Sequence, residues 1–205
     1  MKKRLFFALN ATDPLETTFL PAFKKLKINA DQRDVTVKWV PLDNFHATIT
    51  FIGPMEEELI PGLTAALETV CKNFAPFDLK IEDMGAFSNE HDARVIWLGV
   101  QNKKYLGQFK NALEQELADK SLLPQPEQRD YKPHITIGRL RNPKSVKDMI
   151  SPFKRKSFGK IHVSEIVLYE SELQGVFTVY KPVARCALTG VVQEEIAEPE
   201  PGLIA

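Results

Sequence analysis

A histidine and a threonine two positions apart occur twice in this 205-residue chain, each time within a run typical of a β-strand. The two copies are His46-Ala47-Thr48-Ile49 and His134-Ile135-Thr136-Ile137. Because successive side chains of a strand point to opposite faces, each histidine shares a face with its threonine, while the aliphatic neighbours face the other way. The repeat therefore predicts a duplicated fold, in which two equivalent strands bring two imidazoles and two hydroxyls together.

The overall composition is that of a globular protein with no net charge. Hydrophobic residues make up 43% of the chain and charged residues 26%, and the formal net charge is zero. A chain of this length can bury one sizeable core, and a neutral chain has no long-range attraction to polyanions or membranes. Its basic residues are nevertheless concentrated between Arg139 and Lys160, where eight of them accompany one acidic residue, Asp148. Such a segment is usually a solvated surface, but this one begins directly after the second motif and could contact an anion.

The cysteine content and the amino-terminal segment indicate a cytoplasmic protein. The two cysteines, Cys71 and Cys186, form no CxxC pair, which agrees with a reducing compartment. Residues 1–10 begin with basic residues and continue with an apolar run, as a signal peptide does. That run has only five residues, and no small-residue cleavage site follows it. No stretch has the length that a membrane-spanning helix needs, so we expect no membrane contact.

Hydrophobic periodicity and turn residues predict an alternation of strands and helices along the chain. Asp13 is expected to be the N-cap of the first helix and Pro14 its first residue. Strands are expected at residues 3–10, 37–42, 46–52, 77–87, 94–100, 134–137, 161–170 and 176–187, and helices at residues 14–26, 56–74, 105–118 and 145–150.

This order of elements predicts an α+β protein. We expect a bilobal, duplicated fold in which two antiparallel β-sheets line a central cleft and helices pack outside them. Residues 1–189 would form a single domain of two pseudo-symmetric lobes, because each motif strand follows a helix and precedes a pair of strands. Residues 190–205 are acidic and are expected to form a flexible tail. A cleft built within one chain needs no second copy, so a monomer is expected.

Two imidazoles and two hydroxyls around one small anion indicate acid–base chemistry on a phosphate. With an ordinary pKa of about 6.5, one neutral imidazole can accept a proton from water while the other, when charged, donates one to the departing oxygen. Threonine hydroxyls can donate hydrogen bonds to the non-bridging oxygens. A zinc site is the rival interpretation, but zinc needs at least three protein ligands, and neither a cysteine nor His91 or His162 has a context that supplies the third. We expect neither a metal nor another cofactor.

The two motifs and their flanks resemble a known family. Residues 39–53 and 131–139 are similar to the two HxTx segments of the 2H phosphoesterases, and more narrowly of the RNA 2′,3′-cyclic phosphodiesterases, also called 2′-5′ RNA ligases. Further matching segments are Arg4–Leu9, Arg94–Gly99 and Leu168–Ser171. The resemblance covers about residues 3–187, and Ala47 departs from it slightly, because a larger aliphatic residue is common there.

The resemblance implies a reaction and a role for each motif residue. The reaction is metal-independent hydrolysis of the 2′,3′-cyclic phosphate of RNA or of a nucleotide, which leaves a 2′-phosphomonoester. His46 would be the proton donor to the 3′ oxygen, His134 the proton acceptor that activates water, and Thr48 and Thr136 would hold the phosphate. The two histidines exchange roles in the reverse, ligating direction. The partners expected are therefore RNA ends or nucleotides that carry a 2′,3′-cyclic phosphate.

Two arginines outside the motifs are candidate phosphate contacts. On a regular strand Arg139 would point away from His134, unless Gly138 introduces a bulge. Without a bulge Arg139 would be an ordinary solvated residue. Arg94 begins an apolar strand and could also reach a phosphate, although a charge at the sheet edge is the simpler interpretation.

Three further residues near the predicted cleft are candidates for substrate binding. Arg4 and Phe6 share a strand face opposite Leu5, and if the leucine side is the core, Phe6 could offer a surface on which a base stacks. A second buried face of the sheet would explain Phe6 equally well. Tyr131 directly precedes the second motif and is a similar stacking candidate.

Other functions remain open at this point. The same four residues would serve a 2′-5′ RNA ligase or a 2′-5′ phosphodiesterase, because each of these presents a similar phosphate to the two histidines. A non-catalytic module that binds RNA or nucleotides is the alternative from another class.

Overall fold

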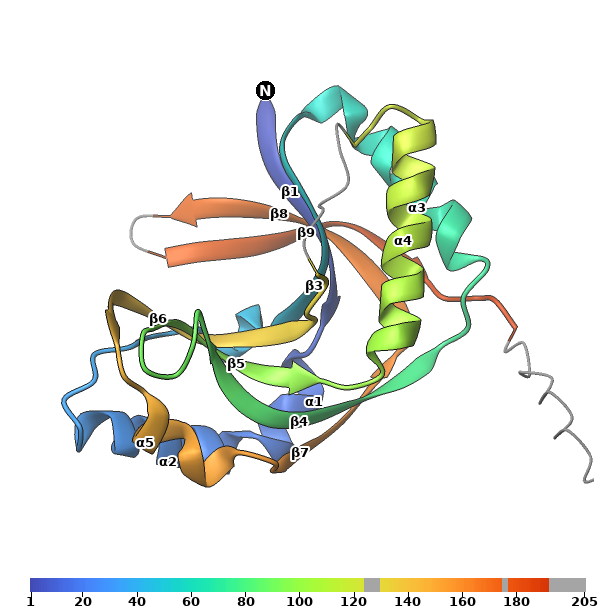
Figure 1. Ribbon diagram of the computed structural model, residues 1–205. Helices are drawn as coiled ribbons and strands as arrows, with labels where there is room; N and C mark the ends of the chain where they lie inside the picture. Colours follow the sequence, from blue (N-terminus) through green and yellow to red (C-terminus); the bar gives the residue numbers. More distant parts are fainter. Residues whose placement is uncertain (124–129, 175–176, 192–205) are drawn as a thin grey trace, which may run out of the picture.

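The curled antiparallel β-sheet in Figure 1 is the framework of the protein. In this computed structural model, residues 1–123, 130–174 and 177–191 are described. The strands are β1 Lys2–Asn10, β2 Lys38–Trp39, β3 His46–Glu56, β4 Phe77–Phe87, β5 Ala93–Val100, β6 His134–Lys144, β7 Ser157–Val163, β8 Glu165–Gln174 and β9 Phe177–Ala187. The helices are α1 Thr12–Thr18, α2 Leu20–Asp31, α3 Ile60–Cys71, α4 Lys103–Asp119 and α5 Lys147–Ile150, with 3₁₀ turns η1 Leu42–Asn44, η2 Glu57–Leu59 and η3 Ser151–Phe153.

The strand order shows the duplication that the two motifs predict. The order is β7-β4-β5-β6-β3-β1-β8-β9, and β2 pairs with the middle of β6, at Gly138 and Arg139. The motif strands β6 and β3 are therefore the two central strands, with three strands beyond each of them. The α+β prediction is confirmed, and the two sheets expected from the sequence are the two halves of one sheet, joined where Ala47 pairs with Ile135.

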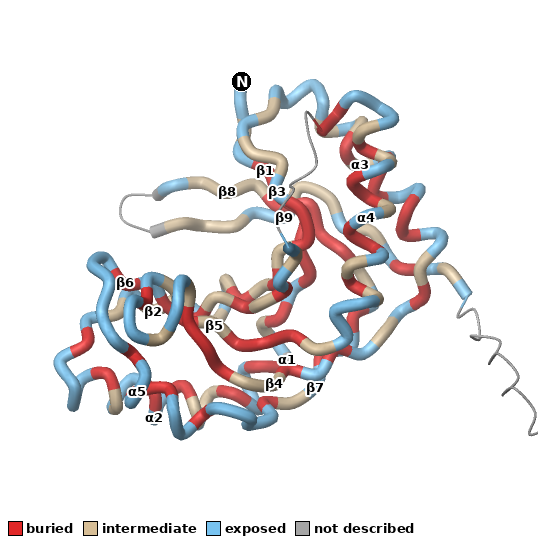
Figure 2. Tube along the Cα trace, in the orientation of Figure 1, coloured by how far each residue is buried: buried red, intermediate tan, exposed pale blue. Residues whose placement is uncertain are grey.

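Helices cover the outer face of each half and leave the inner, concave face open. Helices α1, α2 and α5 lie beside the half that contains β4, β5 and β7, and α3 and α4 lie beside the other half (Figure 1). Buried residues follow the strands and the sides of the helices that face them (Figure 2). The apolar stripe predicted for residues 105–118 is confirmed, because Leu106, Phe109, Leu113 and Leu117 of α4 are all buried.

Both faces of β1 are buried, and they belong to different clusters. Leu5, Phe7 and Leu9 belong to the main core, as their alternation predicts. Phe6 and Ala8 form a small separate cluster on the concave face with Val167 and Tyr169. Of the two interpretations of Phe6, the second buried face is thus the one that the structure shows.

The first predicted helix is divided in two, and its N-cap differs from the prediction. The N-cap is Ala11 rather than Asp13, and the side chain of Asn10 accepts a hydrogen bond from the Thr12 N–H at 2.7 Å. The helix stops at Thr18 and a new one begins at Leu20, because Pro21 near the start of α2 has no N–H to continue the ladder.

Several other predicted boundaries are also corrected. The strand expected at 37–42 is reduced to β2, because η1 begins at Leu42. The strand expected at 161–170 is two strands, β7 and β8, in opposite halves of the curled sheet. Strand β3 continues through Gly53 and Pro54, where Gly53 adopts a φ of +83°. Leu59, which falls within the helix expected at 56–74, lies in η2 and is 41% exposed.

The acidic tail expected at 190–205 falls largely outside the described residues, because only its first two residues are described. Of the proline-rich segment 123–126, which connects two elements in the sequence, only the first residue is described. Within the described part of the chain, none of the helices combines the length and the apolar character needed to cross a membrane.

Candidate active site

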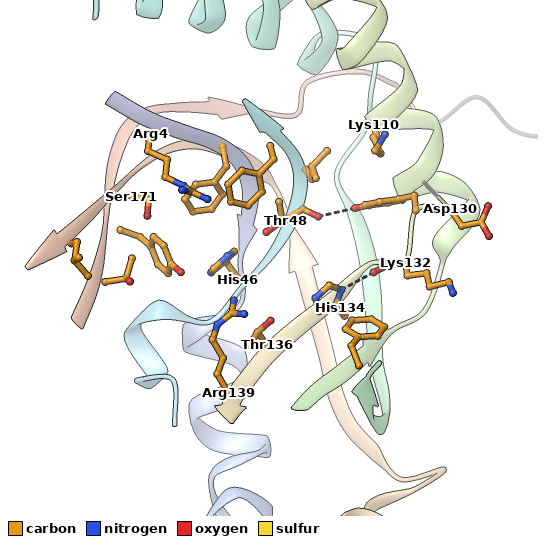
Figure 3. A pocket seen from close by; sticks show the side chains of 18 residues that line it. Arg4, His46, Thr48, Lys110, Asp130, Lys132, His134, Thr136, Arg139 and Ser171 are labelled. Atoms are coloured by element: carbon orange, nitrogen blue, oxygen red, sulfur yellow. Dashed lines mark hydrogen bonds between the residues drawn. The ribbon is translucent and has the colours of Figure 1, made fainter. Parts of the chain in front are cut away.

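A cavity of about 1040 Å³ opens on the concave face where the two halves of the sheet meet. All four motif side chains line it, together with residues from β1, β4, α4, β8 and β9 (Figure 3). The lining residues are Arg4, Phe6, His46, Thr48, Ile49, Phe51, Phe87, Lys110, Asp130, Tyr131, Lys132, His134, Thr136, Arg139, Ser171, Leu173, Thr178 and Tyr180.

The pairing of Ala47 with Ile135 fixes how the motif residues face one another. Both paired side chains are completely buried on the core side. In an antiparallel pair with this register, His46 lies across from Thr136 and Thr48 lies across from His134. Directly opposed residues have Cβ atoms about 5 Å apart. The two histidines therefore occupy diagonal corners of one small group, and the two threonines occupy the other corners.

Equivalent hydrogen bonds orient the two imidazoles. Nδ1 of His46 lies 2.7 Å from the carbonyl oxygen of Asn44, and Nδ1 of His134 lies 2.7 Å from the carbonyl oxygen of Lys132. Each carbonyl belongs to the residue two positions before its histidine and can only accept, so each Nδ1 donates. In the neutral ring this leaves the Nε2 lone pair free to accept a proton.

Burial keeps both histidines neutral at pH 7. Burial lowers the pKa of His46 to about 4, and the positive charge of Arg139 acts in the same direction, against the hydrogen bond to Asn44. The pKa of His134 is also lowered, again chiefly by burial and further by Arg139. A bound anion would oppose both effects, because it stabilises an adjacent imidazolium.

Matching β-bulges follow the two motifs. In β3, Ile49 is skipped in the pairing with β1, since Phe7 pairs with Thr50 and Ala8 with Thr48. In β6, Ile137 is skipped in the same way, since Ile96 of β5 pairs with Gly138 and Trp97 with Thr136. The extra residue reverses the faces of the residues that follow it, up to the next register shift of the strand.

The bulges decide which later residues reach the cavity. Arg139, five positions after His134, lines the cavity, so the conditional prediction of a bulge near Gly138 is confirmed. Phe51, five positions after His46, lines it as well. The two halves thus place different residues, a cation and an aromatic ring, at equivalent positions.

Aromatic rings surround His46. Phe6 is only 1% exposed, and the centroid of its ring lies 5.1 Å from that of His46 and 5.6 Å from that of Phe51. Tyr180 packs edge-on against His46 at 4.8 Å. The exposed ring on this side is Phe51, at 49%, with the guanidinium of Arg4 5.5 Å from its centroid. Phe6 therefore packs against the imidazole as a buried ring, whereas Phe51 and Arg4 face the open cavity.

Buried polar side chains connect β3, the strand of the first motif, to Tyr131 and to α4. Tyr131 donates a hydrogen bond from its hydroxyl to the carbonyl oxygen of Thr48 at 3.0 Å. Lys110 and Glu114 form an ion pair of 2.6 Å, although each is only 6% exposed, and the hydroxyl of Thr50 donates to Glu114 at 3.3 Å. Burial raises the pKa of Tyr131, so its hydroxyl stays protonated as the donor to Thr48.

The sequence candidates are divided by the structure. Arg139, Arg4, Phe6 and Tyr131 line the cavity with the motif residues, whereas Arg94 of β5 does not. Arg94 is exposed near the start of β5, which lies between β4 and β6, so its charge is at the end of an interior strand and not at the sheet edge.

Sequence reasoning missed Phe51, Phe87, Lys110 and Tyr180. Two of them have a signal in the sequence. Phe51 stands at the same distance from its histidine as Arg139 does, and Lys110 and Glu114 interrupt the apolar stripe of α4 at helical spacing. Phe87 and Tyr180 come from strands far away in the chain, and no local pattern marks them.

No group of three or more histidine, cysteine and acidic side chains is placed to hold a metal ion, as far as the described residues extend. The free cysteines are Cys71, which is buried in α3, and Cys186 on β9, and neither lines the cavity.

Comparison with known proteins identifies the family of the chain. The family model described as the 2′-5′ RNA ligase superfamily matches residues 18–175, well over half of the chain. The chain belongs to the 2′-5′ RNA ligase superfamily, within the 2H phosphoesterases.

Members of this superfamily are similar to the chain over nearly their whole length. A protein of Archaeoglobus fulgidus named RNA 2′,3′-cyclic phosphodiesterase is 31% identical, over 87% of this chain and 96% of its own. A protein of Methanothermobacter thermautotrophicus with the same name is 28% identical, over 88% of this chain and 96% of its own.

Solved structures of the superfamily share the fold. A crystal structure of a Thermus thermophilus protein superposes with a TM-score of 0.73, at 26% identity, over 91% of this chain and 98% of its own. Escherichia coli LigT in complex with 3′-AMP gives a TM-score of 0.70, at 26% identity, over 92% of this chain and 99% of its own.

Proposed function

We propose that this member of the 2′-5′ RNA ligase superfamily hydrolyses 2′,3′-cyclic phosphates at RNA ends or on nucleotides, and leaves a 2′-phosphomonoester. The observation that carries the proposal is the diagonal arrangement of His46, Thr48, His134 and Thr136 around one cavity. The names of the relatives from Archaeoglobus and Methanothermobacter support the same activity.

The reaction needs a base and an acid on opposite sides of the phosphorus. His134 Nε2 accepts a proton from water, and the water oxygen forms the new bond to phosphorus. The bond from phosphorus to the 3′ oxygen breaks, and protonated His46 donates its proton to that oxygen. The 2′ oxygen keeps the phosphate.

The threonines and Arg139 would stabilise the charge that develops on the phosphate. Thr48 and Thr136 stand beside the histidines and can donate hydrogen bonds to the two non-bridging oxygens. Arg139 lines the same cavity and adds a positive charge. None of these steps calls for a metal ion, so treatment with EDTA should leave the activity intact.

Because the pKa of His46 is lowered, the bound substrate itself must help to protonate this residue. With a pKa of about 4 in the empty cavity, His46 lacks the proton that it must donate. The negative charge of the bound phosphodiester raises that pKa, so binding of substrate is accompanied by uptake of a proton. We expect a bell-shaped dependence of kcat on pH, because one imidazole must be charged and the other neutral.

The direct test is turnover of a 2′,3′-cyclic nucleotide, with the position of the product phosphate identified by ³¹P NMR. We expect His46→Ala and His134→Ala each to lower kcat by about 10²–10⁴. His162→Ala is the matched control, because His162 lies on β7, is exposed and contacts Asp78 away from the cavity. Near-normal turnover by either motif variant, or a 3′-phosphate product, would refute the proposal.

The ligating direction uses the same residues. Here the 5′-hydroxyl takes the place of water: His134 would accept its proton, the 5′ oxygen would bond to phosphorus, and His46 would donate its proton to the departing 3′ oxygen. The two histidines exchange roles only in the opposite reaction, in which the 3′-hydroxyl attacks the 2′-5′ linkage and the 5′ oxygen departs. A tight complex with the cyclic phosphate that never turns over would instead support a module that only binds RNA.

A further inference from the structure

A second cavity, of about 520 Å³, opens between the β4–β5 hairpin and the segment that leads into β7. We call it the hairpin pocket. Its lining residues include Gly85, Trp97, Asn89, Glu90, Lys154 and Arg155. The proposed reaction uses none of them.

Cross-strand pairing leads from the first cavity to the hairpin pocket along one face of the sheet. Thr136 of β6 pairs with Trp97 of β5, and Trp97 pairs with Gly85 of β4. Directly paired residues of an antiparallel sheet point to the same face. Neighbouring strands lie about 4.8 Å apart, so Gly85 lies about 10 Å from the phosphate-binding threonine. The two cavities are therefore neighbours on the concave face.

A row of aromatic rings spans the same interval. The ring of Phe87 lies 4.8 Å from that of His134 and 5.4 Å from that of Trp97, measured between centroids. Phe87 lines the first cavity and Trp97 lines the hairpin pocket. Both rings are only partly buried. Partly exposed rings in a row are the surface on which successive bases of a single strand stack.

The indole of Trp97 lies across Gly85 and leaves one polar group without a partner. A Cβ atom at Gly85 would lie 2.3 Å from Cζ2 of Trp97, so only glycine allows the ring this position. Nε1 of Trp97 is buried and has no acceptor among the described residues. Buried N–H groups are nearly always paired, and an acceptor brought by a ligand would pair this one.

The charges of the hairpin pocket leave one cation available. Glu90 is occupied by Lys154, whose Nζ lies 2.6 Å from one carboxylate oxygen and 2.8 Å from the other. The carboxylate of Asp83 accepts hydrogen bonds from the N–H groups of Met84 and Arg155. The guanidinium of Arg155, in contrast, is exposed and forms no ion pair with any residue in the described ranges. The two carboxylates and two cations of the lining cancel in sum, but Arg155 is the cation among them that no ion pair holds within the described part of the chain.

We propose that the hairpin pocket binds the RNA chain on the 5′ side of its terminal nucleotide, and this rests on the function proposed above. The cyclic phosphate lies between the histidines, the chain passes over Phe87 and Trp97, and Arg155 contacts an upstream phosphate. The hairpin pocket therefore favours the longer substrate, because it contacts an RNA strand but does not contact a cyclic mononucleotide.

The test compares two substrates, a 2′,3′-cyclic mononucleotide and a short single-stranded RNA ending in the same cyclic nucleotide. The quantity measured is the ratio of kcat/KM for the RNA to kcat/KM for the mononucleotide. We expect a ratio above one in the unaltered protein. Arg155→Ala should lower this ratio about 3- to 10-fold. It should also reduce the slope of the logarithm of the ratio against the logarithm of the salt concentration by about 0.7, the change expected for loss of one phosphate contact.

Two further variants separate a specific contact from general charge. Lys156→Ala is the matched control, because Lys156 is an exposed cation one position away that does not line the pocket, and it should keep the ratio of the unaltered protein. Trp97→Phe keeps an aromatic ring but removes Nε1–H, and it should lower the ratio.

Three outcomes would overturn the proposal. One is a ratio of one in the unaltered protein, and another is an equal loss with Lys156→Ala. The third is a ratio that falls with Arg4→Ala but not with Arg155→Ala, which would show that the RNA chain crosses the half of the sheet that contains β1. Turnover of the mononucleotide reports on the proposed function separately, so the two proposals can fail independently.

Discussion

Ala47 of β3 pairs with Ile135 of β6, and this contact joins the two halves of the sheet at the floor of the active-site cavity. Both side chains are completely buried, so the residues before and after them point into the cavity. The pair stands at the equivalent position of both motifs, directly after each histidine. Its register alone places each histidine opposite the threonine of the other motif.

The first prediction follows from this diagonal arrangement. Thr48→Val and Thr136→Val each keep the shape of the side chain and remove the hydroxyl that would contact a non-bridging oxygen. We expect each to lower kcat by about 10²-fold, with a smaller change of KM, because the hydrogen bonds strengthen as charge develops. Steady-state kinetics with a cyclic mononucleotide measures both. A loss confined to KM would show that the hydroxyls bind the ground state only.

The second prediction concerns pH and stability. The unfolded imidazole of His46 takes up a proton below about pH 6.5, whereas the folded one does so only near pH 4. The unfolded state therefore binds more protons in this interval, and stability falls as the pH falls through it, by at most about 3 kcal/mol for this group.

Replacement of the ring isolates that contribution. The glutamine of His46→Gln cannot titrate, so the variant lacks the loss of stability that protonation of His46 causes. The free energy of unfolding of the unaltered protein minus that of the variant should therefore decrease from pH 7 to pH 4.5. Urea unfolding at each pH measures it. A difference that stays constant over this interval would contradict the lowered pKa.

The third prediction concerns the buried ion pair of α4. Glu114→Gln leaves the ammonium of Lys110 buried without a countercharge, and should lower the free energy of unfolding by about 3–5 kcal/mol. The double change Lys110→Met with Glu114→Leu removes both charges and should cost much less. Glu116→Gln is the matched control, because Glu116 pairs with Lys120 at the same spacing on the exposed side of the helix, and should cost under about 1 kcal/mol. Equal losses in both single variants would refute the argument.

The fourth prediction contrasts two glycines. A Cβ atom at Gly138 would lie 2.6 Å from Val37, so Gly138→Ala should push β2 away from β6 at the bulge that aims Arg139. We expect a loss of about 1–3 kcal/mol in stability and a higher KM. At Gly107, inside α4, a Cβ atom meets nothing within 4 Å, and Gly107→Ala should stabilise the protein by about 0.5–1 kcal/mol without changing kinetics. Thermal unfolding and steady-state kinetics of both variants are the check.

Local alternation made the motif residues predictable from the chain alone. A period of two places His46 with Thr48, and His134 with Thr136, whatever surrounds the strands. The same period separated Leu5 and Phe7 from Phe6. The repeat of one pattern on two strands pointed to a two-imidazole site, and the order of helices and strands indicated the α+β class.

Only the tertiary structure decided what meets the motifs. The skipped residues Ile49 and Ile137 depend on the partner strands, and a one-residue slip reverses every later side chain, so the approach of Arg139 and Phe51 to the cavity could be stated only conditionally or not at all. Tyr180 and Phe87 reach the histidines because the sheet curls, which is a property of the whole ladder rather than of any segment. Alternation along a strand determines the face of each residue, whereas packing determines its neighbours across strands.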